Sequence, residues 1–302
     1  MWLLLIFKMV IIFVLGLIFG SFANVVVDRE GGQKGGEGEN KKNNEKKNKK
    51  RDEKGGKESR EGESFWRGRS KCDYCQQKIV WYDNIPLISY ILLRGKCRHC
   101  QEKISWQYPA VELLFAFGFL LASWQAGGLT GFLTTENLIT TIFYLAISFI
   151  LLTILVWDLK FMIIPDGLVV GGLVLAVIYF GYQYIISPDY LMSVQTDLTR
   201  NFLGGVIVGG FFLAMFQFSR GRWIGGGDVK LGFLLGFLVG WQNSYLLLLL
   251  AYILGAIPAI YLLITGKVTA KTKIPFGPFL VIAALIVLFW GKEILVLWGK
   301  IV

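Results

Sequence analysis

The sequence predicts an all-α polytopic membrane protein with about eight transmembrane helices, and three observations support this class. Hydrophobic residues make up 54% of the 302 residues, and the mean hydropathy is +0.55. Charged residues make up 17%, compared with roughly 25% in a typical soluble domain. The apolar residues form long runs that short polar stretches separate. These features exclude a soluble globular protein and a chain that is disordered throughout.

Eight apolar runs are the candidate membrane helices, since about 20 residues are needed to cross the hydrocarbon core. They lie at about 3–27, 109–127, 137–157, 167–187, 202–218, 228–241, 244–266 and 275–298. Backbone polar groups have no water to bind inside a bilayer, so segments that cross it must be helices or strands of a closed barrel. Barrel strands alternate polar and apolar residues over roughly ten residues. The Leu, Ile, Val and Phe runs do not alternate in this way, so the sequence predicts helices.

The first apolar run has the position of a signal peptide, which is the alternative interpretation. Its apolar stretch continues past 20 residues into Gly20-Ser21-Phe22-Ala23-Asn24, and it has no strongly basic start. These features favour a helix that stays in the protein.

The distribution of basic residues predicts the orientation of the helices. Residues 28–108 hold 20 of the 31 Lys and Arg residues and 13 of the 21 Asp and Glu residues. We therefore expect this loop to face the cytoplasm and the N-terminus to lie outside. The later loops fit an alternation, because those predicted to lie outside carry only Arg200 as a basic residue. The expected location is the cell (inner) membrane, as a multi-pass protein.

This pattern divides the chain into a first transmembrane helix at 1–27, a cytoplasmic loop at 28–108 and a seven-helix membrane core at 109–302. Within the loop, residues 30–64 contain no aliphatic or aromatic side chain. Such a segment cannot bury enough apolar surface to become ordered, so we expect a solvated, disordered insert. An alternative is contact with anionic lipid through the basic cluster at 46–51.

All four cysteines fall in the predicted cytoplasmic loop, as two C-x2-C pairs. The pairs are Cys72 with Cys75 and Cys97 with Cys100, and 21 residues separate them. This arrangement is close to the spacing of tetrathiolate zinc sites and predicts a small cytoplasmic zinc-binding loop. Disulfides are disfavoured in a reducing compartment, and a redox C-x2-C would need only one pair. Four sulfur ligands leave zinc no open position, so the metal would be structural, with His99 a surface residue.

Three aspartates lie at the cytoplasmic ends of apolar runs. Asp158 ends the third run, Asp166 opens the fourth and Asp228 opens the sixth. The predicted topology places all three at a similar depth, where two carboxylates from different helices can meet. Two carboxylates that share a site do not both ionise easily, so one keeps a proton while the other stays charged. Such a pair can activate water and protonate a carbonyl oxygen, which is the chemistry of an aspartic protease.

Three glycines precede the last of these aspartates. Gly225, Gly226 and Gly227 lack a Cβ, so the backbone of another chain could approach closely and present a peptide bond to Asp228.

Each aspartate also has an ordinary structural interpretation. Asp166 and Asp228 each precede a helix and could be N-caps. Asp158 could form an ion pair with Lys160 or Lys230. For Asp166 the structural interpretation is preferred, because Pro-Asp-Gly is a natural helix start.

Six motifs together resemble the type IV prepilin peptidases, a family of G-x-G-D membrane aspartic proteases that act as prepilin leader peptidase and N-methyltransferase. The motifs are Gly20-Ser21-Phe22-Ala23-Asn24, the two cysteine pairs, Arg94-Gly95-Lys96 with Gln107-Tyr108-Pro109-Ala110-Val111-Glu112, Asp158 with Ile164-Pro165-Asp166, Gly225-Gly226-Gly227-Asp228-Val229-Lys230, and Ile274-Pro275-Phe276-Gly277-Pro278-Phe279. They occur in the family's order and cover the chain except for 30–64.

The resemblance implies that Asp158 and Asp228 are the catalytic pair, and that Asp166, Gly225, Gly227 and Lys230 support the site. It implies prepilin or pseudopilin substrates, whose short basic leader is cut at the cytoplasmic face just before an apolar helix. Such substrates are compatible with roles in type IV pili, protein secretion or DNA uptake, and the sequence does not distinguish these. The expected partners are these substrates and membrane lipid, with no nucleic acid.

The resemblance also implies N-methylation of the new N-terminus with S-adenosylmethionine. The sequence shows no glycine-rich nucleotide-binding fold, so no residue is assigned to this cofactor. In the family, the opening motif usually continues with Arg and Pro and soon reaches the first cysteine. Here Asp28-Arg29 is followed by the charged insert, which lies in the region associated with methyl transfer.

Other functions remain open at this point. A G-x-G-D protease that cuts helices within the bilayer is one, although the two cysteine pairs argue against it. A proton-coupled transporter would use Asp158 and Asp228 as a relay, but no inverted repeat of helices is evident. A structural membrane protein with a zinc-clamped loop is the last.

Overall fold

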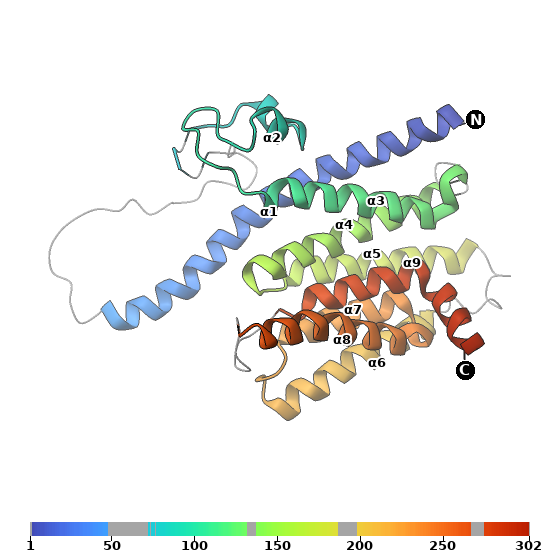
Figure 1. Cartoon of the computed structure of the whole chain (residues 1–302). Coiled ribbons are helices and arrows are strands. Elements are labelled where there is room, and N and C mark those ends of the chain that lie inside the picture. The colour runs from blue at the N-terminus through green and yellow to red at the C-terminus, as the bar shows by residue number, and fades with distance from the viewer. Residues whose placement is uncertain are drawn as a thin grey trace. The chain divides into compact units, whose positions relative to one another are not determined.

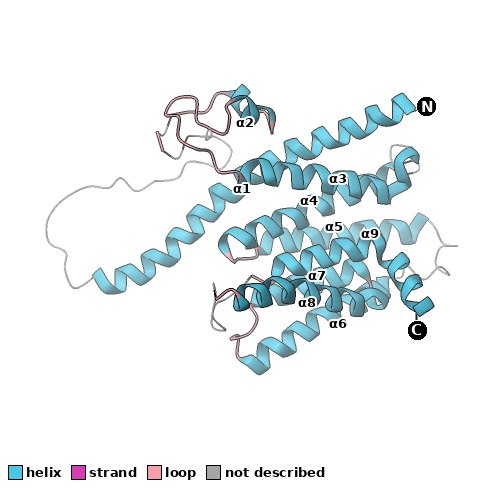
Figure 2. Cartoon of the chain, viewed as in Figure 1, coloured by secondary structure: helices cyan, strands magenta, loops and turns pink. Residues whose placement is uncertain are grey.

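A computed structural model describes residues 2–47, 72, 74–75, 77–131, 137–186, 198–266 and 275–301. Among these residues the structure is almost entirely helical, with an isolated β-bridge between Lys96 and Lys103 (Figures 1 and 2). The prediction of an all-α fold is confirmed. The helices are α1 (Trp2–Lys47), α2 (Ile88–Leu92), α3 (Gln107–Gly131), α4 (Leu138–Phe161), α5 (Asp166–Ile186), α6 (Leu198–Ser219), α7 (Gly226–Val239), α8 (Trp241–Ile264) and α9 (Gly277–Ile301), with a short 3-10 helix at Trp81–Asn84.

The chain forms two compact units. One consists of Val10–Phe117, and the other consists of Met1–Met9 together with Gly118–Val302. The division falls inside α3, whereas the predicted start of the membrane core lies at residue 109. We call the first the N-terminal unit and the second the core unit.

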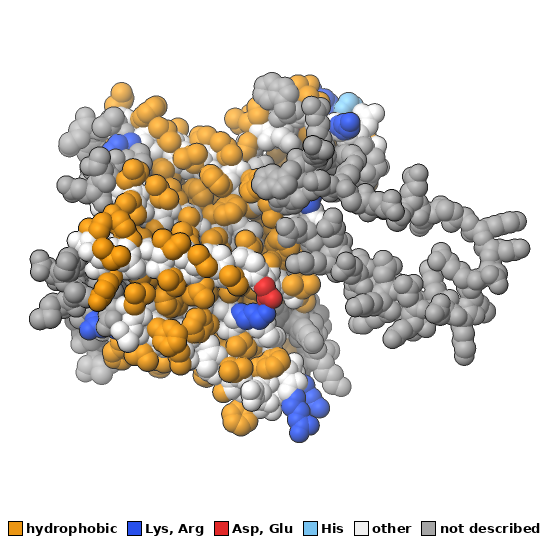
Figure 3. All heavy atoms as spheres, turned by 180° about the vertical axis from the view of Figure 1, so that it is seen from behind, with side chains coloured by type: hydrophobic (Ala, Val, Ile, Leu, Met, Phe, Trp, Pro, Cys, Tyr) orange, Lys and Arg blue, Asp and Glu red, His pale blue; other side chains and the backbone are white. Residues whose placement is uncertain are grey.

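Each of the eight predicted membrane runs corresponds to one helix. In the described part of the chain, six helices are long and apolar enough to cross a membrane, namely α1, α3, α4, α5, α6 and α8. Helix α7 has 14 residues, and among the described residues of α9 the segment Gly277–Gly291 is an apolar helix shorter than a full span. On the face of the molecule drawn in Figure 3, hydrophobic side chains make up most of the surface of the helical bundle. The protein is therefore multi-pass, while a count of eight complete crossings stays a prediction.

Helix α7 is the central helix of the core unit. It packs against α5, α6, α8 and α9, and its residues from Leu231 to Val239 are largely buried. A helix that is apolar on all sides belongs in the interior of a bundle. At 1.5 Å per residue, its 14 residues extend over only about 21 Å. Its length follows from its place inside the bundle.

Helices α6 and α7 lie in direct backbone contact. A Cβ at Gly204 would overlap the carbonyl oxygen of Gly236, and a Cβ at Gly236 would overlap that of Gly204. At Gly232, a Cβ would lie 2.6 Å from the Cδ2 atom of Phe212. Small residues permit such close packing of membrane helices. Because lipid tails are as apolar as the helices, helix association depends on this packing rather than on the hydrophobic effect.

In the N-terminal unit, Glu112 joins the loop to two membrane helices. Its buried carboxylate accepts a hydrogen bond of 2.8 Å from the backbone N–H of Leu87 and interacts with the side chain of Ser21 on α1. A Cβ at Gly20 would lie 2.7 Å from the Cα of Glu112, so α1 and α3 pack closely here. Asn24 also donates a hydrogen bond of 3.2 Å to the carbonyl oxygen of Tyr108.

The first helix differs from its prediction. We expected it to end near residue 27 and the insert at 30–64 to have no ordered structure, but the backbone of α1 continues to Lys47. Once a helix exists, each added residue gains a backbone hydrogen bond without a new nucleation step. The composition of this segment shows that it cannot form a hydrophobic core of its own. It does not show that the preceding helix can continue into it. Residues 48–64 lie outside the described part of the chain.

Candidate active site and metal centre

Asp158 lies in the last turn of α4, and its side chain is only 5% exposed. The helix ends at Met162, which adopts a left-handed conformation with φ of 54° and donates its N–H to the carbonyl oxygen of Asp158 at 2.9 Å. A four-residue connection, 162–165, then leads into α5. This tight reversal holds the carboxylate at the end of the helix.

Asp228 lies in the first turn of α7. The backbone N–H of Gly225 donates to its Oδ2 atom at 3.2 Å, and its own N–H donates to the carbonyl oxygen of Gly225 at 3.2 Å. Gly225 is the N-cap residue, so the prediction that Asp228 itself could be the N-cap is wrong. The carboxylate instead lies near the positive end of the helix dipole, which favours negative charge.

These two aspartates are 70 residues apart in the chain, and the fold brings the helix ends that carry them near each other. The Asp228 carboxylate is close enough to act electrostatically on Asp158. The charge of Asp228 also reaches Tyr252 on α8. The arrangement can therefore provide two interacting carboxyl groups at the end of a helical bundle.

Gly277, the first residue of α9, adds a backbone N–H that interacts with the Asp158 carboxylate. A Cβ at this position would lie 2.5 Å from Oδ2 of Asp158 and 3.5 Å from Cδ1 of Ile164. The side chain of Ile164 also lies against Gly227, where a Cβ would approach its Cβ to 3.1 Å. Gly227 therefore allows close internal packing, while Gly225 is exposed.

Gly277 was not among the predicted site residues. The signal that could have identified it is Pro275-Phe276-Gly277-Pro278, because the first N–H groups of a helix have no partner within the helix and can bind an anion. The sequence alone does not show which carboxylate this helix start faces.

Asp166 does not join the pair. Its two carboxylate oxygens lie 2.8 and 2.9 Å from Nζ of Lys230, and both side chains are exposed. The alternative in which Asp158 pairs with Lys230 is therefore wrong, since Lys230 binds Asp166. Val169 donates its N–H to the carbonyl oxygen of Pro165, which makes Pro165 the N-cap and Asp166 the first residue of α5.

The four cysteines form a second candidate site, in the N-terminal unit. Their sulfur atoms all lie within 4.8 Å of one another, and all four are free thiols. The sulfurs of Cys72 and Cys100 are 3.8 Å apart. Tetrahedral zinc with Zn–S bonds of about 2.3 Å places its sulfurs about 3.8 Å apart. The cluster therefore fits a metal ion, and His99 is exposed and outside it.

The two cysteine pairs share one backbone hydrogen bond among the described residues. Cys72 donates its N–H to the carbonyl oxygen of Gln77 at 3.0 Å, and Cys97 donates to Glu102 at 2.8 Å. In both pairs, the first cysteine is bonded to the residue five positions later. In the second pair, the N–H groups of Cys100 and His99 lower the pKa of the Cys97 thiol to about 7, whereas burial and the three neighbouring sulfurs raise the pKa of Cys100. Without a metal the cluster therefore favours one thiolate, at Cys97.

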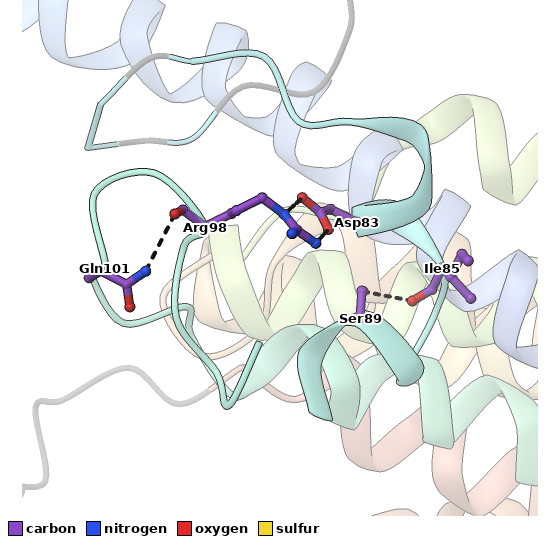
Figure 4. A network of polar contacts seen from close by, with 5 residues as sticks. All are labelled: Asp83, Ile85, Ser89, Arg98 and Gln101. Carbon is purple, nitrogen blue, oxygen red and sulfur yellow. Dashed lines mark hydrogen bonds and ion pairs between the residues drawn. The ribbon is translucent and has the colours of Figure 1, made fainter. Parts of the chain in front are cut away.

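An ion pair between Arg98 and Asp83 stabilises the loop that contains the cysteines (Figure 4). Arg98 donates two hydrogen bonds to Asp83, from Nε at 2.9 Å and from Nη2 at 2.7 Å. These bonds hold the pKa of the Asp83 carboxyl below its usual range. The contact is bidentate, so it fixes the orientation of the second cysteine pair relative to the helix at Trp81–Asn84.

Comparison with known proteins gives two family matches. Residues 14–126 match the bacterial peptidase A24 N-terminal domain, and residues 144–260 match the type IV leader peptidase family. The prepilin leader peptidase/N-methyltransferase of Pseudomonas putida is 32% identical over 290 residues, or 93% of this chain and 90% of the relative. The enzyme of the same name from Legionella pneumophila is 34% identical, over 75% of this chain and 74% of the relative. The one from Pseudomonas aeruginosa is 33% identical, over 93% of this chain and 89% of the relative. This chain belongs to the type IV leader peptidase family.

Membership in this family confirms the resemblance and makes the chain a protease. The N-terminal match contains all four cysteines, and the second match contains Asp158 and Asp228. None of these matches supports the transporter. No solved structure matches the chain at a significant level.

Proposed function

We propose that Asp158 and Asp228 are the catalytic pair of an aspartyl endopeptidase that removes the leader of prepilin or pseudopilin substrates. The observation that carries this proposal is the convergence of the two helix ends: Ile164 packs against Gly227, the residue before Asp228, and against Gly277, which lies beside the Asp158 carboxylate. The two carboxyl groups also interact electrostatically. The names of the relatives support the substrate class. The chain's inner-membrane location, with the N-terminus outside and the catalytic face in the cytoplasm, is part of the same proposal.

The chemistry follows from one shared proton. The ionised carboxylate takes a proton from a water molecule, which attacks the carbonyl carbon of the scissile bond. The protonated carboxyl group gives its proton to the carbonyl oxygen, and the tetrahedral intermediate then collapses with proton transfer to the leaving amine. Each carboxylate faces a backbone N–H, from Gly277 or from Gly225, that stabilises its charged form. The proton therefore belongs to the pair rather than to one residue.

Cleavage of a purified prepilin by the purified protein tests this proposal. Replacing Asp158 or Asp228 by Asn keeps the size of the side chain but removes its ionisation. Each single change should lower the cleavage rate by at least about 1000-fold, and the double change should add little, because the residues act as one unit. Asp166→Asn is the matched control and should keep substantial activity, since exposed ion pairs contribute little. Robust cleavage by the Asp158→Asn protein would move the first carboxylate to Asp166.

A second activity, N-methylation of the new N-terminus with S-adenosylmethionine, is supported by the names of the relatives. When bound, this cofactor would supply the methyl group, but we assign no residue to it. Methylation of a substrate that has already been cut should survive the Asp158 and Asp228 changes if it uses a separate cytoplasmic site. We further propose that Cys72, Cys75, Cys97 and Cys100 hold a structural zinc ion.

A further inference from the structure

We propose that the hydroxyl of Tyr252, on α8, donates a hydrogen bond to the carbonyl oxygen of the scissile peptide bond. This inference rests on the proposed function and adds a third side chain to the catalytic pair. Tyr252 belongs to the core unit, as both aspartates do, and lies outside the six sequence motifs. Its place beside the pair follows from an aromatic cluster formed by Phe211, Phe212, Tyr252 and Phe276.

Phe212 of α6 connects the aromatic cluster to the face of α7 that carries Asp228. Gly232 lies four residues after Asp228 and therefore on the same face of the helix. A Cβ at Gly232 would lie 2.6 Å from the Cδ2 atom of Phe212, so the Phe212 ring covers this face one turn beyond the carboxylate. The Phe212 ring also lies against that of Phe276, with 5.8 Å between the ring centroids. The cluster therefore lies on the Asp228 side of α7.

Phe276 connects the aromatic cluster to Asp158. It is followed directly by Gly277, the residue that lies beside the Asp158 carboxylate. The Tyr252 ring is tilted against the Phe276 ring at a centroid distance of 5.3 Å. One turn later on α8, a Cβ at Gly255 would lie 3.4 Å from the Cε2 atom of the same ring. The Tyr252 side of α8 therefore packs directly against the residue that precedes α9, next to Asp158.

The Tyr252 hydroxyl is available to a substrate. It donates to the Sδ atom of Met215 at 3.2 Å, and a thioether is a weak acceptor. The side chain is 38% exposed, and the charge of Asp228 reaches it. In apolar surroundings a hydroxyl gains more from a carbonyl oxygen than from a thioether sulfur. Exchange of the Met215 sulfur for a peptide carbonyl is therefore favourable.

A donor at this place complements the catalytic pair. The two backbone N–H groups beside the pair serve the carboxyl groups themselves, since Gly225 donates to Asp228 and Gly277 interacts with Asp158. Negative charge develops on the carbonyl oxygen of the substrate as water attacks, and a preorganised donor stabilises this charge in the transition state. The Tyr252 hydroxyl keeps its proton throughout the reaction, while proton transfer stays with the aspartates.

Removing the hydroxyl tests this role, because Tyr252→Phe keeps the ring and its packing. For a soluble prepilin peptide we expect kcat to fall about 100-fold, the effect of losing one such donor, with KM within about threefold. Tyr261→Phe is the matched control, because Tyr261 is also exposed but lies nine residues later on α8, on the opposite face of the helix. The control should stay within about twofold of the parent, as exposed substitutions usually do. A Tyr252→Phe protein with kcat within about threefold of the parent, or with a change in KM alone, would overturn the proposal.

Two further variants separate this role from a structural one. If the bond between Tyr252 and Met215 only held α6 and α8 together, Met215→Leu would cost as much as Tyr252→Phe. We expect Met215→Leu to keep kcat within about twofold instead, because the exchange conserves volume. Replacing Tyr252 by 3-fluorotyrosine makes the hydroxyl a stronger donor at nearly the same size. At about pH 6, where the phenol stays protonated, this protein should match or exceed the kcat of the parent.

A fluorotyrosine protein as slow as Tyr252→Phe, or a Met215→Leu protein equally impaired, would also overturn the proposal. All variants are compared at equal helix content. If the unmodified protein cleaves the peptide and Tyr252→Phe does so equally fast, this inference fails while the proposed function stands. Failure of the unmodified protein to cleave would instead refute the proposed function.

Discussion

Gly277 lies directly beside the Asp158 carboxylate, at a position where only a residue without a side chain fits. A Cβ there would be 2.5 Å from Oδ2, closer than non-bonded atoms approach, and the carboxylate would have to move. Because Asp158 is buried at the end of α4, it has little free space in which to do so. The position of the Asp158 carboxyl group, one of the proposed catalytic pair, thus depends on a residue that has no side chain.

Gly277→Ala should therefore lower the rate of cleavage by about 100-fold, the effect expected when a reacting group is displaced by about 1 Å. Gly171→Ala on α5 is the control, because no atom of the described residues lies within 4 Å of its Cβ position and Gly171 is exposed. The control should stay within about twofold of the parent, as exposed substitutions usually do. Steady-state kinetics on a soluble peptide measure both. Full activity of Gly277→Ala would contradict the close approach of this residue to Asp158.

At the scale of elements, the cysteine pairs should behave as one metal-dependent structure. The protein, purified without chelator, should contain about one zinc ion per chain. Replacing any one of the four cysteines by Ser should remove the metal and make the loop sensitive to proteases while the helix content is retained, because metal binding supplies the folding free energy of such loops, roughly 10 kcal/mol or more. His99→Ala should keep the metal. Metal analysis that finds no zinc in the parent protein would disprove the site.

The zinc should also be lost in acid. Protons compete with the metal for the thiolates, and the folded loop already lowers the pKa of Cys97 to about 7. Since this pKa is depressed, its contribution to stability is present at higher pH and disappears as the pH falls through the folded value. Bound metal depresses it further, so release should begin below pH 7. A chromogenic chelator measures this release, and zinc loss that increases with rising pH would contradict the mechanism.

The helical elements were largely predictable, because apolar length and the absence of alternation are properties of short segments. Each predicted run corresponds to a helix, and the termini mostly agree within a few residues. The continuation of α1 to Lys47 was not predictable from composition. The shortness of α7 was visible in the sequence, but its central position was not, since this depends on contacts with four other helices.

In the candidate sites, too, local features were predictable from the sequence and contacts between distant segments were not. The cysteine spacing predicted a four-sulfur cluster because short motifs fix local geometry, and the cluster is present. That Asp158 and Asp228 lie near enough to interact electrostatically depends on how the helices are arranged, and the roles of both residues stay predictions. The pairing of Lys230 with Asp166, and the approach of Gly277 to Asp158, arise from segments distant in sequence that no single motif connects.

At the scale of the whole molecule, the charged insert should be dispensable for cleavage. Replacing residues 30–64 by a short Gly/Ser joint should leave the cleavage rate within about twofold, because the entropy of loop closure changes only with the logarithm of loop length. The same prepilin assay, at equal helix content, measures this. A large loss of cleavage would show that the insert contacts substrate or lipid. Retained cleavage with lost methylation would assign the segment to the second activity.

The backbone contact between Gly204 and Gly236 has a consequence for genetic screens. Gly236 lies eight residues beyond Asp228 on α7, about 12 Å away along the helix axis. Any side chain at either glycine would force α6 and α7 apart, and α7 carries Asp228. A random mutagenesis screen for inactive alleles should therefore return both positions as often as the aspartates themselves. Protein abundance in the membrane would separate the two groups, since alleles at the glycines should accumulate poorly and alleles at the aspartates normally.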